Sequence, residues 1–357
     1  MLKRNRWLIS WLILALIIKI FSSFPHAVEN YYSNALYPVI GQIQRILFGW
    51  IPFSVGDLLY AAAIIYLISS AIRIYRIIKR KKLTKSFVLI KLRKWTTVML
   101  AVYVLFNILW GLNYNRLGVA NKLQIQPGKY SKEELTEVVR LIIYKLNSFD
   151  QSSRNPMRSL KKKRVLFNGA IASYGALAKT DPEFTYAFPS VKPSLYSYLG
   201  NYLGFTGYYN PFTGEAQVNT TVPLFLQPFT TAHEIGHQIG YAKESEANFI
   251  SFLSNRVSSD PAFQYSLYFD LYAYARRYIH ISDTALLRSF DKQLKPDIAN
   301  DYILLRRFLA RHANPVEVVI DKLYSQYLRA NQQPSGRLSY NEVIGWLVAY
   351  YRKYGTI

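Results

Sequence analysis

The sequence contains no cysteine at all, and charged residues make up only 18% of its 357 residues. The absence of cysteine excludes a disulfide framework, a thiolate metal site and a cysteine nucleophile. The low charge, together with 51% hydrophobic residues, excludes an intrinsically disordered chain. The length allows one sizeable core together with a membrane anchor.

Acidic residues are scarce relative to basic ones, with 21 against 44, which gives a formal net charge of +23. A charge of this size raises the question of a nucleic-acid partner. The densest basic run, however, occupies residues 73–94 and lies between two apolar stretches. The positive-inside rule places such a run on the cytoplasmic side of a membrane. We therefore interpret the charge as membrane topology and predict no nucleic-acid partner.

Three apolar stretches lie in the first third of the chain, near residues 7–24, 51–75 and 95–112. Each approaches the roughly 20 residues that a helix needs to cross a bilayer. The first stretch follows basic residues as a signal peptide would, but no small-residue cleavage pattern comes after it. We therefore predict that residues 1–113 form an α-helical membrane anchor of three transmembrane helices in the lipid bilayer.

The basic residues also predict the orientation of this anchor. The N-terminus and the run at 73–94 should both be cytoplasmic, so residues 25–50 should lie outside. The third span then exits outward, and residues 114–357 should fold on the extracytoplasmic side. Residues 43–53 are aromatic and weakly charged, which favours a position in the membrane interface.

Residues 114–357 carry the patterns of a mainly helical α+β domain with a small sheet. Ser131 and Glu134 have the spacing of a capping box, and an apolar face at helical spacing follows them. Residues 214–219 alternate like a strand. Helical patterns return at residues 231–239 and in further segments toward the C-terminus.

The most informative segment is the HExxH motif formed by His233, Glu234 and His237. On a helix, the two histidines lie one turn apart on one face and can bind one cation. Nitrogen ligands of this kind suit Zn²⁺, one ion per chain, and the ligand type also permits other divalent metals. Glu234 can take a proton from metal-activated water and deliver it to a leaving amine. The alternative is a core helix with two histidines by accident, but its buried polar groups would then need other partners.

A catalytic zinc site usually has three protein ligands, so a third ligand is expected close to the motif. Glu244 and Glu246 both follow it, and they point to different sides of a helix because they are two residues apart. Glu244 shares a face with Asn248, which is then placed to hydrogen-bond a ligating histidine. We therefore prefer Glu244 as the third ligand and keep Glu246 as the alternative.

The HExxH helix followed by residues 244–248 resembles the arrangement of gluzincin metallopeptidases, in which a glutamate is the third zinc ligand. The three N-terminal stretches, residues 209–216, 233–240 and 243–249 resemble a bacterial family catalogued as domain of unknown function 3810, which is grouped with the zincins. The resemblance implies a zincin-like fold for residues 114–357. It also implies a place in the bacterial inner membrane, with the C-terminal domain in the periplasm.

The resemblance to zincins also implies where a substrate binds. In zincins, a strand just before the motif helix pairs with the substrate backbone as an added edge strand. The residues at this position in the present sequence are Gly214, Glu215, Ala216 and Gln217. A group that stabilises the oxyanion is also expected, and Tyr209 and Tyr340 are candidates for it. Each tyrosine has packing as its alternative role.

These observations predict a multi-pass membrane protein whose zinc-dependent domain hydrolyses peptide bonds of an envelope protein or peptide. The alternative hypothesis is a catalytically inactive zincin-like protein that acts as a binding or scaffold module. The intact Glu234 argues against this alternative, because a structural metal site has no use for that carboxylate. A transporter is disfavoured, because the predicted spans carry no cluster of charges. No oligomeric state is predicted.

Overall fold

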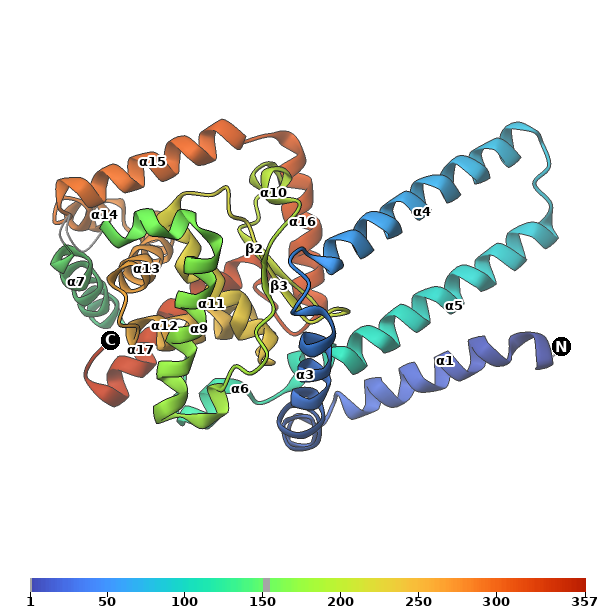
Figure 1. Ribbon diagram of the computed structural model, residues 1–357, viewed down its shortest axis with the longest axis horizontal. Coiled ribbons are helices and arrows are strands. Elements are labelled where there is room, and N and C mark those ends of the chain that lie inside the picture. The colour runs from blue at the N-terminus through green and yellow to red at the C-terminus, as the bar shows by residue number, and fades with distance from the viewer. Residues whose placement is uncertain (1, 150–154) are drawn as a thin grey trace.

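The computed structural model describes residues 2–149 and 155–357, and it has a helical body from which three long helices extend (Figure 1). The long helices are α1 (Leu2–Phe21), α4 (Val55–Lys79) and α5 (Lys85–Leu109). All three leave the same side of the body, and α1 packs along α5. The connection between α4 and α5, with its basic residues, lies at the end farthest from the body.

Large apolar side chains are exposed along each of these three helices. By length and composition, α4 is the one described helix that could cross a membrane on its own. The segments Arg6–Phe21 and Pro25–Phe48 also meet these criteria when they are taken together as one bent element. One or two elements thus support membrane association, and the third predicted span, which falls in α5, stays a prediction.

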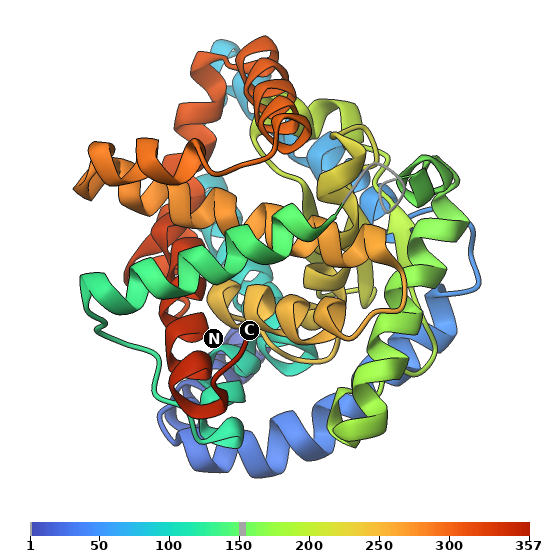
Figure 2. The same cartoon turned by 90° about the vertical axis from the view of Figure 1, so that its left-hand side faces the viewer.

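The chain between α1 and α4 turns sharply at the base of the long helices. It forms α2 (Pro25–Ala27), the π-helix η1 (Val28–Leu36) and α3 (Tyr37–Phe48). This segment is bent by 100° from α1 and runs across the bottom of Figure 2. The stretch predicted to lie in the membrane interface, residues 43–53, falls at its end.

The body is mainly helical, as the sequence predicts. The predicted capping box of Ser131 and Glu134 is confirmed and begins α7 (Lys132–Ser148). The other described helices of the body are η2 (Gly111–Asn115), α6 (Gly118–Leu123), η3 (Asn155–Lys161), α9 (Lys163–Thr180), η4 (Pro182–Phe184), α10 (Ser197–Leu203), η5 (Leu224–Leu226), α11 (Gln227–Gln238), α12 (Glu244–Arg256), α13 (Pro261–Ser282), α14 (Thr284–Asp291), α15 (Pro296–His312), α16 (Pro315–Ala330), η6 (Gly336–Glu342) and α17 (Val343–Tyr354).

A small sheet of three strands lies beside α11. Its strands are β1 (Val191–Pro193), β2 (Gly207–Asn210) and β3 (Glu215–Val218), in the spatial order β1-β3-β2. β3 pairs with β1 in parallel and with β2 in antiparallel orientation. The strand predicted at residues 214–219 therefore exists as β3, but it is the central strand of the sheet. β2 lies beside it at one edge.

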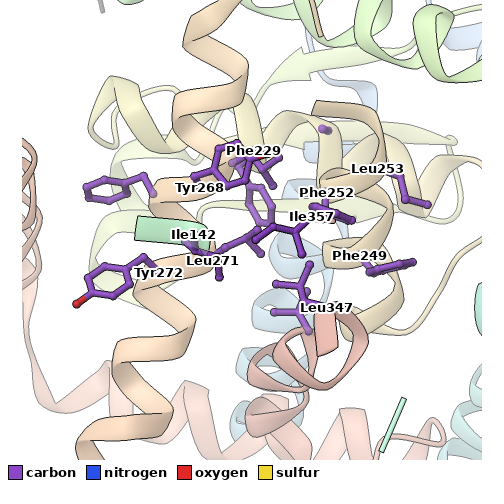
Figure 3. Packing of buried hydrophobic residues seen from close by; sticks show 14 of the residues in the cluster. Ile142, Phe229, Phe249, Phe252, Leu253, Tyr268, Leu271, Tyr272, Leu347 and Ile357 are labelled. Carbon is purple, nitrogen blue, oxygen red and sulfur yellow. The ribbon is translucent and has the colours of Figure 1, made fainter. Parts of the chain in front are cut away.

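The main hydrophobic core surrounds α11, α12 and α13. Figure 3 shows Phe252 of α12, Leu271 of α13 and Leu347 of α17 gathered with Phe229 of α11. Every residue of α11 is buried. Polar side chains on this helix must therefore find their partners inside the protein, because an unpaired buried polar group is costly.

A second buried cluster joins the N-terminal third of the chain to the body. It brings Tyr37 of α3 and Trp110, at the end of α5, together with Tyr209 of β2 and Ala242. The predicted boundary at residue 113 therefore does not separate two independent cores.

Candidate metal centre

The helix that carries the HExxH motif, α11, begins earlier than predicted, at Gln227. Pro228 lies in its first turn, where the missing N–H of proline costs no helical hydrogen bond. Gly240 follows the end of the helix with a φ of +97°, a conformation that glycine adopts without strain. The chain then turns back, and α12 packs against α11. Glu244, the first residue of α12, faces the motif.

His233 and His237 of α11 converge with Glu244 of α12. Oε2 of Glu244 lies 3.2 Å from Nε2 of His233 and 3.5 Å from Nε2 of His237. One possible ligand atom from each residue lies within 4.8 Å of the other two, and all three residues are buried. Around a tetrahedral ion with bonds of about 2.0–2.2 Å, ligand atoms are separated by about 3.3–3.6 Å. The triad could therefore hold a metal ion.

The second nitrogen of each imidazole has a partner of its own. Nδ1 of His233 lies 2.8 Å from Oδ1 of Asn248, and Nδ1 of His237 lies 2.7 Å from the carbonyl oxygen of Tyr241. Both oxygens accept a hydrogen bond, so in its neutral form each ring would carry its proton on Nδ1 and direct a lone pair from Nε2 toward the centre. Asn248 thus has the contact that its spacing from Glu244 predicts.

Two buried carboxylate oxygens at the centre, Oε2 of Glu234 and Oε2 of Glu244, accept no hydrogen bond from the described residues. A buried carboxylate oxygen without a hydrogen-bond donor is costly, so such atoms indicate a group that the protein is built to receive. A cation at the triad would supply the partner for Glu244. Two imidazoles and one carboxylate form a donor set that Zn²⁺ accepts in catalytic sites.

The two carboxyl groups at the centre have opposite proton affinities. Burial raises the pKa of Glu234 to about 8. Burial also acts to raise the pKa of Glu244, but the facing His237 and His233 outweigh it and hold that pKa well below its usual range. Glu244 is thus a stable anionic ligand, whereas Glu234 accepts a proton readily.

The pKa values of the two histidines are shifted in opposite directions. Burial is the main influence on His233, and it lowers the pKa of this residue. Burial also acts to lower the pKa of His237, but the charge of Glu244 outweighs it and raises that pKa to about 9. The carboxylate of Glu244 is therefore the dominant charge of the centre.

Glu244 is held in place by two further residues that no sequence pattern indicated. Tyr324 of α16 donates a hydrogen bond of 2.7 Å to Oε1 of Glu244. The backbone N–H of Glu244 donates to Oε1 of Gln333 over 2.9 Å. Tyr324 is one of 30 tyrosines and lies 80 residues beyond Glu244, so only the fold could identify it.

Glu246, the alternative third ligand, points away from the histidines. Its carboxylate lies against Gly118, whose φ of +80° and lack of a side chain leave room for it. The charge of Arg116 acts on it there. The alternative is therefore wrong, because Glu246 occupies the opposite side of α12, as the two-residue spacing from Glu244 requires.

Glu234 lies beside the edge strand β2. A Cβ placed on Gly207 would lie 2.5 Å from Oε1 of Glu234 and 2.9 Å from its Cγ and Cδ. Any side chain at Gly207 would thus collide with the carboxylate. The absence of a side chain at this position allows the strand to approach the predicted general base directly.

The predicted substrate-binding strand, residues 214–217, is not open to a substrate, so this prediction is wrong. Both edges of β3 are paired, and Ala216 lies opposite residues of β1 and β2. Gly214 forms the turn from β2 with a φ of +67°. The side-chain amide of Gln217 lies 3.0 Å from Oγ of Ser54, at the start of α4.

Glu215, the fourth residue of this set, joins the sheet to the start of α4. Its carboxylate accepts hydrogen bonds from the backbone N–H groups of Val55, at 3.1 Å, and Gly56, at 2.5 Å. Nζ of Lys192 lies 2.5 Å from the same carboxylate, and both side chains are buried. The anion thus stabilises the N-terminus of a long helix.

Of the two tyrosine candidates for oxyanion stabilisation, the structure describes the side chain of Tyr209 only. The ring of Tyr209 packs against Trp110 with centroids 5.0 Å apart. Its hydroxyl lies 3.4 Å from that of Tyr37. Tyr209 therefore has the packing role that was its alternative. Tyr340 lies in η6, and its side chain falls outside the part of the chain that the structure describes.

Side chains from the N-terminal third of the chain bind the last carbonyl groups of the motif helix. Nε1 of Trp110 donates to the carbonyl oxygen of His237 over 3.1 Å. The hydroxyl of Tyr37 and Nη1 of Arg45 donate to the carbonyl oxygen of Gln238 over 2.8 and 3.1 Å. Such donors stabilise a helix C-terminus, so the predicted anchor takes part in building the centre.

The comparisons with known proteins identify a family for the chain. No curated protein and no solved structure matches the chain. The model of one family, described as protein of unknown function (DUF3810), matches residues 32–348. This match covers α11, α12 and the N-terminal segments that support them. The chain therefore belongs to the family DUF3810.

Proposed function

We propose that the chain is a zinc-dependent metallopeptidase, anchored in the bacterial cytoplasmic membrane, that hydrolyses peptide bonds of an envelope protein or peptide. The observation that carries this proposal is the position of Glu234. Its carboxylate is buried, has an oxygen without a hydrogen-bond partner, and follows His233 directly on the helix that supplies both imidazoles of the convergent triad. A structural metal site does not need this additional carboxylate.

The residues of the centre have distinct roles in this proposal. When bound, Zn²⁺ polarises a substrate carbonyl and lowers the pKa of a water molecule to near neutrality. His233, His237 and Glu244 hold the ion, and Asn248 and Tyr324 orient the ligands. Glu234 takes a proton from the water and later delivers it to the leaving amine.

The edge strand β2 replaces β3 as the proposed binding strand for the substrate backbone. Among the described residues, β2 pairs with β3 along one edge only. The backbone carbonyl groups of Thr206 and Asn210 point toward β3. Because this direction alternates along a strand, the backbone N–H and C=O groups of Gly207 and Tyr209 point toward the other edge. An extended peptide can add to such an edge through main-chain hydrogen bonds. A peptide added to this edge would lie beside Gly207, next to Glu234.

We also propose that α1, α4 and α5 cross the membrane together as a three-helix anchor. Their exposed apolar side chains and their common direction support this arrangement. The basic connection between α4 and α5 lies at the far end and would be cytoplasmic by the positive-inside rule. The body with its metal centre would then lie on the extracytoplasmic, periplasmic side.

Peptide cleavage by the full-length chain tests the proposed function. The full chain is required because Tyr37, Arg45 and Trp110 support the motif helix. Purified in detergent and loaded with zinc, the wild-type chain should cleave members of a fluorogenic peptide library. Glu234→Gln should keep its zinc and lose about 10²–10⁴-fold in rate, the usual contribution of a general base.

A matched variant separates this effect from a general loss of charge. Glu133→Gln makes the same change at an exposed position on α7 and should retain full activity. If the zinc-loaded wild type cleaves no peptide, or if Glu234→Gln cleaves as fast as the wild type, the peptidase proposal is wrong. The first of these results would favour the binding module instead.

A further inference from the structure

The helix α16 carries a row of apolar side chains that nothing in the described structure covers. Val316, Val319 and Leu323 are 55%, 57% and 56% exposed. Their spacing of three and four residues places them on one face of the helix. Three large aliphatic side chains in one row at this exposure are unusual for a face in contact with water.

This exposed row lies at the side of the body from which the long helices leave. Tyr327, one turn beyond Leu323, has its hydroxyl 3.2 Å from that of Tyr114, just after α5. Tyr327 also lies close enough to Tyr60, in the second turn of α4, for an electrostatic interaction. Figure 1 shows α16 at the side of the body from which α4 leaves.

A second exposed apolar group, on α10 and at Leu195, two residues before it, lies next to the same end of α4. Leu195, Tyr198 and Leu199 are all exposed. The backbone N–H of Leu195 donates to Oδ2 of Asp57 over 2.7 Å, which ties this segment to the first turn of α4. α10 also packs against α16. The two apolar groups therefore form one surface around the end of α4.

We propose that this surface of α10 and α16 is a membrane-contact surface, seated in the headgroup region of the outer leaflet. The proposal rests on the three-helix anchor of the proposed function. If α4 spans the bilayer, its first turns mark the outer boundary of the hydrocarbon, and the surface lies at that level. Tyrosine side chains at such a boundary are typical of membrane interfaces.

The charges on α16 agree with an interface of phospholipid headgroups. Lys322 and Arg329 are exposed basic residues on this helix. The helix has two acidic residues: Glu317, whose carboxylate lies beside Gly204, and Asp321, which is neutralised by Arg337, with Nη1 2.8 Å from its carboxylate. Basic residues near an anionic lipid surface each contribute about 1 kcal/mol of attraction. Lipid therefore suits this surface better than an extended cationic partner would.

The position of α16 indicates which substrates the centre would take. One side of the helix carries Val319 and Leu323, and the other directs Tyr324 to the predicted ligand Glu244. One helix thus separates the metal centre from the bilayer surface. The substrate class is then a polypeptide tethered to the membrane, cut in an extended segment close to the outer surface, rather than a freely diffusing peptide.

The absence of cysteine makes a direct test possible with the full-length chain. Single cysteines at Val319, Leu323 and Tyr198 would be labelled with bimane, and each variant would be reconstituted into phosphatidylglycerol–phosphatidylcholine vesicles. Ile65→Cys in α4 is the reference within the bilayer. Tyr144→Cys is the reference in water, because Tyr144 is 72% exposed on α7, at the opposite end of the body.

Quenching by brominated acyl chains and by aqueous iodide distinguishes the possible environments. We expect brominated lipid to quench the labels at positions 319, 323 and 198 less than the label at 65 but clearly more than the label at 144. We expect iodide to quench the label at 144 most strongly. If iodide quenches the labels at positions 319 and 323 as strongly as the label at 144, the surface lies in water and the proposal is wrong.

Two other outcomes would also overturn the proposal. Protection of the labels at positions 319 and 323 from both quenchers would mean that protein, such as a second copy of the chain, covers the surface. Failure of brominated lipid to quench 65 would overturn the anchor itself. None of these outcomes bears on zinc binding or cleavage, so the metallopeptidase proposal is tested separately.

Discussion

The carboxylate of Glu234 occupies the space that a side chain on Gly207 would need, since a Cβ there would lie 2.5 Å from Oε1. Gly207→Ala should therefore displace the proposed general base while the triad keeps its metal. We expect peptide cleavage to fall by about 10²-fold or more, the lower end of a general base's contribution, with zinc content unchanged. Cleavage rate and zinc content measured on the same preparation check this.

A second glycine provides the control for this substitution. Gly175, in α9, has no atom within 4 Å of the position that a Cβ would take. Gly175→Ala should leave cleavage unchanged and stabilise the helix by about 0.5–1 kcal/mol. Equal activity of Gly207→Ala and Gly175→Ala would show that Glu234 does not need this space.

Asn248 should control the affinity of the centre for its metal through His233. Its Oδ1 lies 2.8 Å from Nδ1 of that ring and fixes which nitrogen faces the triad. Asn248→Ala should weaken zinc binding by about 10–100-fold, as is usual for loss of a partner behind a ligand. Competition with a zinc-binding dye measures this change.

The matched variant for Asn248 lies on the same helix. Both amide atoms of Asn255 are buried and have no hydrogen-bond partner among the described residues. Asn255→Ala removes the same groups from α12 at a position without a role in the centre. Zinc affinity should therefore stay at the wild-type value, and a loss equal to that of Asn248→Ala would assign the effect to helix packing.

The buried pair of Lys192 and Glu215 should make the anchor and the sheet unfold as one unit. Glu215→Gln leaves the ammonium group of Lys192 buried without its anion, which typically costs about 3–5 kcal/mol. Thermal unfolding of the full chain in detergent should shift clearly downward. Glu134→Gln, which removes the partly exposed partner of Arg352 (2.6 Å), should have only a small effect. Similar shifts for both variants would contradict the structural role of Glu215.

Asp270 should make the protein less stable as the pH rises. Burial raises the pKa of this carboxyl well above its usual range, although Arg277 acts in the opposite direction. Its folded-state pKa thus exceeds the unfolded value, so its favourable contribution is complete below about pH 4 and is lost as the pH rises toward the folded-state value. Asp270→Asn should therefore raise the melting temperature at neutral pH, with a gain that grows from pH 4 upward.

A carboxylate with a partner provides the comparison for Asp270. Asp291 lies 2.7 Å from Nη2 of Arg276. Asp291→Asn removes this ion pair and should lower the melting temperature at neutral pH. A gain for Asp270→Asn that stays constant between pH 4 and pH 8 would mean that this carboxyl is not protonated in the fold.

The parts of the site that are local in the chain could be predicted from the sequence. His233 and His237 are one helical turn apart, and Glu244 and Asn248 share a face in the same way. This helix periodicity also distinguishes Glu244 from Glu246. Such relationships need only the regular geometry of one helix, so they do not depend on how the rest of the chain folds.

The parts that depend on contacts between distant segments could not be predicted. The central position of β3 depends on β1, a strand of three residues that is too short to show alternation. Tyr324 reaches Glu244 only because α16 returns to the centre. Likewise, no pattern shows that Trp110, in the predicted anchor, would bind the carbonyl group of His237. The predicted boundary at residue 113 overlooked this contact.

The zinc content of the full-length chain, purified in detergent, tests the central claim most directly. Wild type, Glu244→Ala and Glu246→Ala would be supplied with zinc, dialysed and measured side by side. We predict about one zinc per chain in the wild type and in Glu246→Ala, and a large loss in Glu244→Ala alone. A wild-type chain that holds no zinc, or a loss in Glu246→Ala with retention in Glu244→Ala, would contradict the metal centre described above.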